Sequence, residues 1–506
     1  MRATSLARWA PYLLLFAVAV LVGAELARPF RSASISFDSS ATVLYFQRIV
    51  SGQRLEAFVT TTPKPLLTLL FGLAHAITQD WRSLAWLTLL AHGVGVTMAA
   101  YLAARLAGPV AAAFVGVGLM NDATVLIDVG FASATPYALV GWASAALALT
   151  AARPRYLVAG VALALATLAR VETLVLVGVA LLIVGWGTWA PPARRGEALP
   201  REAWLVPLVG LLALPVMLVH DQLLAGDALY WTKPASVYGA NLAGSLPSAL
   251  DVAQTMAGHY WAMGGVVLLA LLGAAILLWQ RRLVALAGVL ALGPGVALFL
   301  LVLAARHLIV PARYLSAVDA AVIVAAGVGL AAIGLRAPLD GFADRLGDRA
   351  RALGTSLVPV GIAALAAVVL CGFYWQQDPR LRAIVEESRR LALDTERVEP
   401  ALSTAAPAGV LPDGKPRILV PVPVQPRVAV DLGRTLLEVG PSSASRIDLA
   451  AGKPSAGQIL FHDRAADGTD PRWGDFETTT PRSVGPVTLV PVYTEPARGI
   501  WVVAVR

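Results

Sequence analysis

The chain has 506 residues, of which 57% are hydrophobic and only 14% are charged, and its mean hydropathy is +0.69. Soluble domains contain about a quarter charged residues, so this composition excludes an ordinary soluble protein and indicates a chain that lies largely in lipid. The net charge of +8 does not indicate nucleic-acid binding, because cytoplasmic loops of membrane proteins carry an excess of Lys and Arg.

Long apolar runs predict an all-α polytopic membrane bundle in residues 1–375. A helix needs about 20 apolar residues to cross the bilayer core, and about eleven runs approach that length. The first run has no small-residue cleavage pattern, so we expect a retained anchor rather than a signal peptide. The predicted spans are 9–27, 83–106, 109–127, 135–152, 155–170, 172–189, 203–224, 261–280, 283–304, 315–335 and 355–375.

The arginines predict how this bundle is oriented. With the N-terminus in the cytoplasm, most arginines of the bundle fall in the inner segments, as the positive-inside rule requires. The short outer loops then hold only Arg170, Lys233, Arg306 and Arg313. The sequence therefore predicts a multi-pass membrane protein with a cytoplasmic N-terminus and an extracytoplasmic C-terminus.

The first outer loop, residues 28–82, contains more polar and charged side chains than a simple connection between helices needs. It contains Phe37-Asp38-Ser39-Ser40 and Tyr45, and then Lys64-Pro65 at the start of the apolar segment 66–79. That segment is too short to span a bilayer, so we expect an interfacial or re-entrant helix packed against the bundle. A lone carboxylate followed by a lysine at the mouth of an apolar helix suggests a binding or catalytic site.

Residues 376–506 predict a second domain, because Pro, Asp, Arg and Ser become more frequent and the apolar runs shorten. Residues 380–397 are expected to form a charged helix, and 400–416 a Pro-rich linker. Strand-length runs follow at 418–424, 428–432, 447–449, 459–462, 487–493 and 500–505. These runs predict a small extracytoplasmic α+β or mostly β domain.

Short motifs on the predicted outer side resemble those of a known family. They are Asp38, Lys64-Pro65-Leu66, Ala169-Arg170-Val171-Glu172, Gly226-Asp227-Ala228-Leu229-Tyr230 and Pro311-Ala312-Arg313-Tyr314-Leu315. In this order they resemble signatures of the GT-C superfamily of glycosyltransferases, integral-membrane enzymes that use polyprenyl-phosphate sugars. The appended outer domain is similar to that of bacterial arabinofuranosyltransferases, which build cell-wall arabinan. The resemblance implies a bacterial cell-membrane enzyme.

Two positions depart from the family pattern. Many relatives have two adjacent acids in the first loop, whereas serines follow Asp38 here, and Val171 stands where Pro is usual. The missing second acid argues against a metal. The single cysteine, Cys371, provides no disulfide or Cys-based metal site, and the six histidines show no metal-ligand spacing. No cofactor is therefore predicted, although the family leaves a divalent metal open.

The resemblance implies a role for each candidate residue. A lipid phosphate leaves without protonation, so one carboxylate, Asp38, suffices as the base that takes the acceptor's proton in an inverting single displacement. Cations that bind the donor phosphate are expected at Lys64, Lys233, Arg306 and Arg313. The substrate cavity is expected to include Tyr45, Asp122, Asp128, Arg170, Glu172, His259, His307 and Tyr314.

Several of these residues have a purely structural alternative. Asp38 would also serve as the N-cap of a helix over 39–50, and Lys64 would also extend its amine to the membrane interface. Asp122 and Asp128 fit solvated loop acids. His259, in His259-Tyr260-Trp261, fits an aromatic belt at the membrane surface.

The predicted function is transfer of a hexose or pentose from a polyprenyl-phosphate donor to an envelope glycan, lipid or protein, in a setting of membrane lipid without nucleic acid. A polytopic transporter or lipid-glycan flippase is the alternative from another class. Such proteins carry ionisable residues mid-span, whereas these spans are nearly free of charge and the polar residues gather at one face. An inactive GT-C-like scaffold is the third interpretation, because the double acid is absent.

Overall fold

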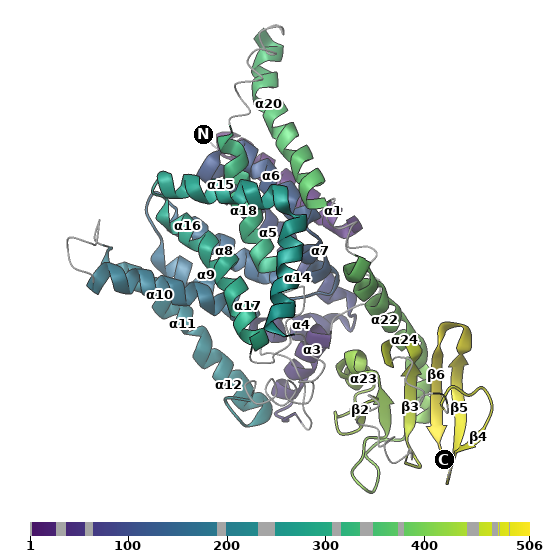
Figure 1. Cartoon of the computed structure of the whole chain (residues 1–506). Coiled ribbons are helices and arrows are strands. Elements are labelled where there is room, and N and C mark those ends of the chain that lie inside the picture. The colour runs from purple at the N-terminus through teal and green to yellow at the C-terminus, as the bar shows by residue number, and fades with distance from the viewer. Residues whose placement is uncertain are drawn as a thin grey trace.

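The computed structural model describes residues 3–26, 37–55, 64–189, 199–230, 248–305, 315–333, 348–372, 379–442, 455–467, 474, 476–484 and 486–506. These residues form a helical bundle and, at one end of it, a domain built on a β-sheet (Figure 1). Two helices that belong to neither set, α3 (Phe37–Val50) and α4 (Pro65–Thr78), lie at the end of the bundle that faces the sheet domain.

The bundle consists of apolar helices and a few short turns. The helices are α1 (Ala3–Leu26), α5 (Arg82–Ala107), α6 (Pro109–Asn121), α7 (Ala123–Gly130), α8 (Thr135–Leu149), α9 (Tyr156–Ala169), α10 (Leu174–Trp189), α11 (Leu205–Leu211), α12 (Ala213–Ala225), α14 (Ala249–Ala262), α15 (Gly264–Trp279), α16 (Leu283–Leu290), α17 (Val296–Ala305), α18 (Ser316–Ala332) and α20 (Asp348–Ala367). The turns are η1 (Val171–Thr173), η3 (Arg201–Trp204), η4 (Ala291–Gly295) and η6 (Val368–Gly372).

Helix lengths confirm membrane-spanning segments but do not establish how many there are. Three described segments are long and apolar enough to cross a membrane, namely 82–107, 201–225 and 283–305. The bent pairs α6–α7 and α14–α15 would add one span each. Helices such as α8 and α9, with 15 and 14 residues, are shorter than the roughly 20 residues that a straight crossing needs. The number eleven therefore stays a prediction.

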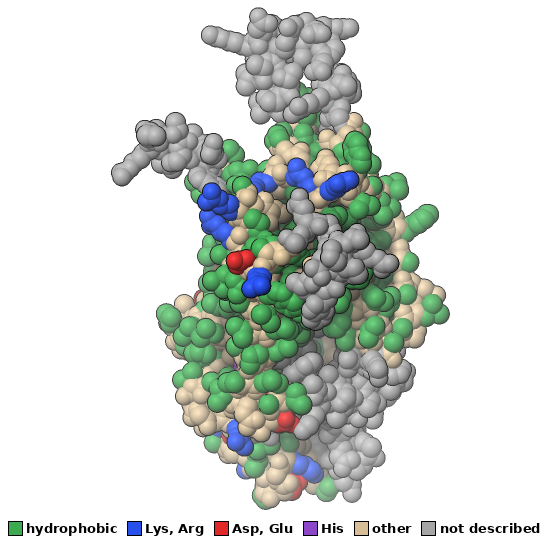
Figure 2. Space-filling view, turned by 90° about the vertical axis from the view of Figure 1, so that its left-hand side faces the viewer, with side chains coloured by type: hydrophobic (Ala, Val, Ile, Leu, Met, Phe, Trp, Pro, Cys, Tyr) green, Lys and Arg blue, Asp and Glu red, His purple; other side chains and the backbone are tan. Residues whose placement is uncertain are grey.

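The surface agrees with a lipid setting. Figure 2 shows hydrophobic side chains over most of the bundle on that face, with Lys and Arg side chains gathered toward the end away from the sheet domain. At that end Arg105 donates to the carbonyl of Thr150 at 2.9 Å, and Arg282 donates to the carbonyl of Arg105 at 3.2 Å.

Local chemistry explains where the helices break. Asp122 ends α6 and caps α7 by accepting a hydrogen bond from the backbone N–H of Val125 at 3.0 Å, and the two helices meet at 55°. The segment 283–305 contains the π-turn η4 at Pro294, because proline supplies no backbone N–H to the helix ladder. The chain turns between α9 and α10 through the short 3₁₀ turn η1.

Helices α15 and α18 pack backbone to backbone through glycines. A Cβ atom on Gly329 would lie 2.0 Å from the carbonyl oxygen of Leu269, and one on Gly273 would lie 1.9 Å from that of Ala325. Such distances are far inside van der Waals contact, so only glycine permits this approach. Small residues serve the same purpose at many helix contacts in membranes.

We expect Gly329→Ala to lower the thermal stability of the protein. The new methyl group forces α15 and α18 apart, and overpacking of this kind costs typically about 1–3 kcal/mol. Thermal unfolding in detergent, followed by tryptophan fluorescence, measures the effect. Gly361→Ala in α20 is the matched control, because a Cβ there meets nothing within 4 Å. Equal midpoints for the two variants would contradict the account of the α15–α18 contact.

The C-terminal part of the chain folds around a six-stranded mixed sheet. Its elements are α22 (Pro379–Ala405), β1 (Ile418–Val420), η7 (Val422–Val424), α23 (Gln425–Asp431), β2 (Val439–Pro441), β3 (Ile459–Asp463), α24 (Arg464–Asp467), β4 (Arg482–Val484), β5 (Val487–Glu495), η10 (Pro496–Arg498) and β6 (Ile500–Val505). The strand order is β2-β1-β3-β6-β5-β4. Strand β1 is parallel to β2 and β3, whereas β6 is antiparallel to β3 and β5, and β5 is antiparallel to β4.

This domain agrees with the α+β expectation in outline and differs in detail. The predicted strands at 459–462, 487–493 and 500–505 are confirmed. The run 428–432 is not a strand but part of helix α23, and 418–424 is a strand only over its first three residues. The predicted linker begins later than expected, since α22 continues to Ala405 with Pro400 inside it. The run 447–449 lies outside the described residues.

The sheet domain shares a hydrophobic core with α3 and α4. Leu44 of α3 and Phe71 of α4 are fully buried in one cluster with Ile418 and Val428 of the sheet domain. Helix α23 packs directly on α3. Helices α3 and α4 are thus held between the bundle and the C-terminal domain.

Candidate functional site

Asp38 and Lys64 form an ion pair at the end of the bundle that faces the sheet domain. The Lys64 Nζ lies 3.3 Å from Oδ2 of Asp38, with 10% and 21% of the two side chains exposed. Asp38 lies in the first turn of α3, where the helix dipole stabilises a negative charge. Lys64 immediately precedes α4, whose first residue is Pro65. The two residues predicted to carry the chemistry are therefore in direct contact and partly open to solvent.

The contacts of this pair test the alternatives that Asp38 only caps a helix and that Lys64 only extends to the membrane interface. Helix α3 begins at Phe37, so Asp38 is inside the helix rather than its N-cap. The N-terminal turn of α3 is anchored instead by Ser39, whose hydroxyl donates to the carbonyl of Ala132 at 2.8 Å. Lys64 directs its amine toward a carboxylate and not only toward the membrane surface. The interpretation of Asp38 as a helix N-cap is wrong.

Tyr45 lies in the core behind the pair. Burial raises the pKa of Tyr45, and the nearby groups Tyr230, Asp38 and Asp221 raise it further. Its ring meets that of His220 edge-on, with 6.0 Å between the ring centroids. His220 in turn contacts Thr68 of α4 at 3.2 Å and Asp221 at 3.1 Å. Tyr45 and His220 thus fix α3, α4 and α12 relative to one another.

Arg170 is the centre of a second polar cluster, which is buried inside the bundle. The guanidinium Nη1 of Arg170 lies 3.5 Å from Oδ2 of Asp128, and its Nε lies 3.5 Å from Oε2 of Glu172. Ser316 accepts from Arg170 at 3.1 Å and donates to Asp128 at 3.0 Å, and Thr135 bonds to all three. Arg170 and Glu172 are thus paired with each other at the turn between α9 and α10, and their place in a substrate cavity stays a prediction.

Asp122 belongs to a third cluster, with His259 and Asp319. The hydroxyl of Thr124 lies 2.6 Å from Asp122 Oδ1 and 2.9 Å from Asp319 Oδ2. Nε2 of His259 lies 3.0 Å from Oδ1 of Asp319. The expectation that Asp122 and Asp128 are solvated loop acids is wrong, because the turn at Asp122 folds both of them into the bundle. His259 is buried as well and does not belong to an exposed aromatic belt.

Sequence reasoning missed four members of these clusters, Thr124, Thr135, Ser316 and Asp319. It also treated the spans as nearly free of charge, which is wrong at Asp319 in α18. A signal was present, since a lone acid in an apolar run is costly in a membrane and marks a paired or functional group. Thr124, Thr135 and Ser316 carried no comparable signal, because small hydroxyl residues are common in membrane helices.

The remaining candidates, Lys233, Arg306, His307, Arg313 and Tyr314, lie outside the described residues. Their roles stay predictions. In the described part of the chain, no group of three or more His, Cys, Asp or Glu side chains is arranged as a metal site.

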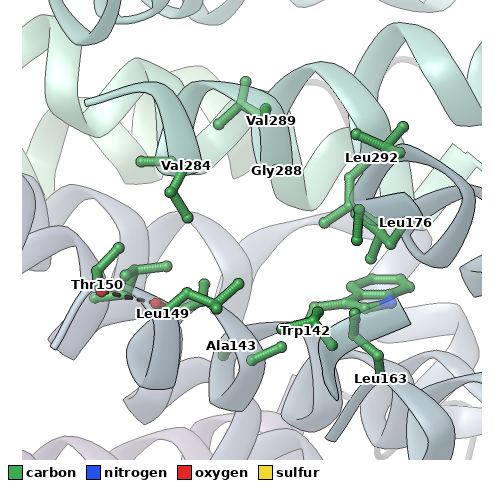
Figure 3. Close-up of a pocket in the computed structure, with 18 of the residues that line it drawn as sticks. Trp142, Ala143, Leu149, Thr150, Leu163, Leu176, Val284, Gly288, Val289 and Leu292 are labelled. Atoms are coloured by element: carbon green, nitrogen blue, oxygen red, sulfur yellow. Dashed lines mark hydrogen bonds between the residues drawn. The ribbon is translucent and has the colours of Figure 1, made fainter. Parts of the chain in front are cut away.

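A partly open apolar cavity of about 210 Å³ lies between helices of the bundle (Figure 3). Trp142 and Leu163 line it on one side, and Val284, Val289 and Leu292 line it on the other. None of the described residues that line it is charged. This cavity accepts hydrocarbon and offers nothing to hold a phosphate, so the polar chemistry of the protein lies elsewhere.

An apolar groove of about 620 Å³ lies between α4, α5, α8 and α9. Leu66 of α4, two residues after Lys64, lines one part of it, and the rest comes from α5, α8 and α9. Wall residues such as Val94, Leu157 and Val161 are exposed, so the groove is open on the surface of the bundle. Helix α4 thus contributes Leu66 to the groove, while Lys64 immediately precedes the same helix.

Comparison with known proteins gives the fold a name. No protein-family model and no curated protein match the sequence. The structure is similar to that of ArnT from Cupriavidus metallidurans bound to undecaprenyl phosphate, with a TM-score of 0.57, 13% identity and 98% of each chain covered. The apo state of ArnT gives a TM-score of 0.54 and 14% identity over 99% of this chain and 98% of that chain.

A more distant likeness is the archaeal oligosaccharyltransferase AglB from Archaeoglobus fulgidus, in complex with an inhibitory peptide and a dolichol-phosphate. It covers 84% of this chain and 64% of that chain, with 12% identity and a TM-score of 0.45. The likeness to ArnT, in contrast, extends over almost the whole of both chains. The chain is a multi-pass membrane protein with the GT-C fold.

Proposed function

We propose that the protein is a membrane glycosyltransferase that moves a sugar from a polyprenyl-phosphate donor to a cell-envelope acceptor. The observation that carries this proposal is the Asp38–Lys64 ion pair, formed at the helix α4 that also lines an apolar groove, in a chain with the GT-C fold. A base, a phosphate-binding cation and a hydrocarbon surface are the three features that such a donor requires.

Lys64 and the groove bind different parts of the donor. The ammonium of Lys64 pairs with the lipid phosphate, and the groove lined by Leu66 takes the first part of the polyprenyl chain. The solved ArnT structure with undecaprenyl phosphate supports a lipid phosphate as the ligand class. Lys233, Arg306 and Arg313 are proposed to add further cations to the phosphate site.

Asp38 acts as the base in a single displacement. Its carboxylate takes the proton of the acceptor hydroxyl, whose oxygen bonds to the anomeric carbon while the bond from that carbon to the phosphate oxygen breaks. The polyprenyl phosphate leaves as an anion, so it requires no general acid. The displacement inverts the anomeric configuration.

The ion pair links the base to donor binding. Without donor, the ammonium of Lys64 pairs with the carboxylate of Asp38. A bound phosphate competes for the same ammonium, which leaves the carboxylate of Asp38 available to the acceptor hydroxyl when the sugar to be transferred is in place.

The site faces the outside of the cell in this proposal. Arg105 and Arg282 gather at the opposite end of the bundle, which the positive-inside rule assigns to the cytoplasm. The C-terminal domain then lies outside the bacterial cell membrane, where it is placed to hold a wall glycan, a lipid or a protein as acceptor. A pentose donor, as in the arabinofuranosyltransferases, fits the resemblance of the appended domain.

Binding of a lipid phosphate tests the donor class. We expect Lys64→Met to weaken the binding of undecaprenyl phosphate roughly 10- to 100-fold, because one hydrogen bond to a charged group contributes about 1.5–3 kcal/mol. Native mass spectrometry of the purified protein with the lipid measures the affinity. Lys415→Met, at an exposed lysine of the sheet domain, is the control. The donor assignment fails if wild type does not bind the lipid, or if Lys64→Met binds it as well as wild type does.

A further inference from the structure

Trp81, just before α5, connects the bundle to the sheet domain. Its indole N–H donates to Oδ1 of Asp431 in α23 at 2.7 Å. The guanidinium of Arg427 lies over the indole, 5.9 Å from the ring centroid, and its Nε lies 3.4 Å from Oδ2 of Asp431. We call these three residues the interdomain latch.

The latch is embedded on both sides. On the bundle side, the indole packs against the ring of His75 in α4, with 4.4 Å between the centroids. On the sheet-domain side, Arg427 pairs with Glu396 of α22 at 3.0 Å. Burial raises the pKa of Asp431, while Arg427 and the indole N–H lower it again. A buried carboxylate held by two donors has a defined position, because any shift leaves its charge unsatisfied.

The two helices of the proposed active site, α3 and α4, are connected to the latch by packing contacts. Helix α4, which carries His75, starts immediately after Lys64. Helix α3, which carries Asp38, packs on α23, and its Arg48 donates to the carbonyl of Arg434 at 3.3 Å. The C-terminal domain therefore touches α3 directly and reaches α4 through Trp81, while none of the latch residues touches Asp38 or Lys64 in the described contacts.

The rate of a catalysed reaction is sensitive to small shifts of the helices that position the reacting groups. A displacement of about 1 Å at a reacting group can cost about 10²-fold in rate. The 3.3 Å spacing of Asp38 and Lys64 is set by how α3 and α4 lie against each other. A loss of the latch frees the end of α4 at His75 and the contact surface of α3 together.

We propose that Trp81 and Asp431 are positioning residues, through which the C-terminal domain sets the spacing between Asp38 and Lys64. The expected effect on catalysis rests on the proposed function. The claim that the latch holds α3 and α4 in place does not depend on that function. It gives the C-terminal domain a direct part in the transfer step.

Trp81→Phe in the full-length protein tests the latch, because phenylalanine keeps a ring and removes the N–H donor. We expect kcat for sugar transfer to fall roughly 10- to 100-fold, while undecaprenyl phosphate binding is retained. Asp431→Ala should have a similar effect, and the double variant should lose no more than either single variant, since the two residues act as one unit. Asp431→Asn, which keeps an acceptor oxygen for the indole, should restore most of the activity.

Hydrogen–deuterium exchange supplies a readout that does not depend on catalysis. In Trp81→Phe the amides of α3 and α4 should exchange faster, while those of α15 and α18 stay as in wild type. Trp279→Phe, at an indole that is 84% exposed in α15, is the matched control and should change neither readout.

Two sets of outcomes separate this inference from the proposed function. If wild type transfers sugar, and Trp81→Phe has wild-type kcat and wild-type exchange in α3 and α4, the positioning role is wrong and the function stands. If wild type transfers no sugar from a polyprenyl phosphate, the function fails, and the exchange of α3 and α4 alone decides whether the latch holds them. Additive losses in the double variant would also contradict the latch.

Discussion

Asp38→Asn is expected to lower the rate of sugar transfer by about 10²- to 10⁴-fold, the usual contribution of a positioned general base. Asparagine has almost the same shape and can still accept a hydrogen bond from Lys64, so α3 and α4 should keep their places. It cannot take the proton of the acceptor hydroxyl. The loss should therefore appear in kcat, with binding of undecaprenyl phosphate unchanged or stronger, because Lys64 no longer faces a competing negative charge.

The measurement is a transfer assay with a radiolabelled polyprenyl-phosphate sugar and the protein in lipid nanodiscs. Asp80→Asn provides a control for the loss of a carboxylate in the same loop region, since Asp80 is exposed and asparagine can replace its hydrogen bond to the backbone of Arg82. Turnover by Asp38→Asn at the wild-type rate would remove Asp38 from the mechanism.

Arg170→Met is expected to have the largest effect on folding. The substitution leaves the carboxylates of Asp128 and Glu172 buried without their counter-charge, and removal of one partner of a buried ion pair typically costs about 3–5 kcal/mol. A loss of that size is a large part of the total stability of most proteins. We expect a low yield of monodisperse protein and a much lower unfolding temperature.

Neutral partners should recover part of this loss. In the triple variant Arg170→Met, Asp128→Asn, Glu172→Gln no charged side chain of this cluster remains, so its stability should lie between those of Arg170→Met and wild type. Arg153→Met, at an exposed position between α8 and α9, is the control and should unfold as wild type does. A normal unfolding temperature for Arg170→Met would show that the charges of this cluster are balanced in another way.

The sequence predicted the bundle and the first loop because both depend on local patterns. Apolar runs bounded by charges predict helices in lipid, and Lys64-Pro65 predicts a helix start, since proline is favoured in the first turn. A site that contains Asp38 and Lys64 was expected, but a direct contact between the two side chains was not predicted. Residues 26 positions apart are brought together by tertiary packing, which a single sequence does not encode locally.

The errors have equally specific causes. The run 428–432 has the apolar, β-branched composition of a strand, but five residues are too few to separate a strand from a buried helical turn. Pro426 near the start of α23 was the signal for a helix. The burial of Asp122 and Asp128 depends on the bend between α6 and α7, which places a loop-like sequence inside the bundle.

The interdomain latch could not have been predicted at all. Trp81 and Asp431 are 350 residues apart, and neither belongs to a motif. A tryptophan between two apolar helices is an ordinary feature of a membrane surface, and an acid at the end of a short run is an ordinary feature of a soluble domain. Only the packing of α23 on α3 brings Trp81 and Asp431 together in one interdomain contact.

The most direct test of the account is the reaction of the purified wild-type protein with defined donors. The protein would be offered polyprenyl-phosphate pentoses and hexoses with an envelope acceptor, and the lipid and glycan products would be identified by mass spectrometry and NMR. We predict release of polyprenyl phosphate in step with a glycosylated acceptor of inverted anomeric configuration. Transfer with retention of configuration, or transfer from nucleotide sugars but from none of the lipid phosphates, would contradict it.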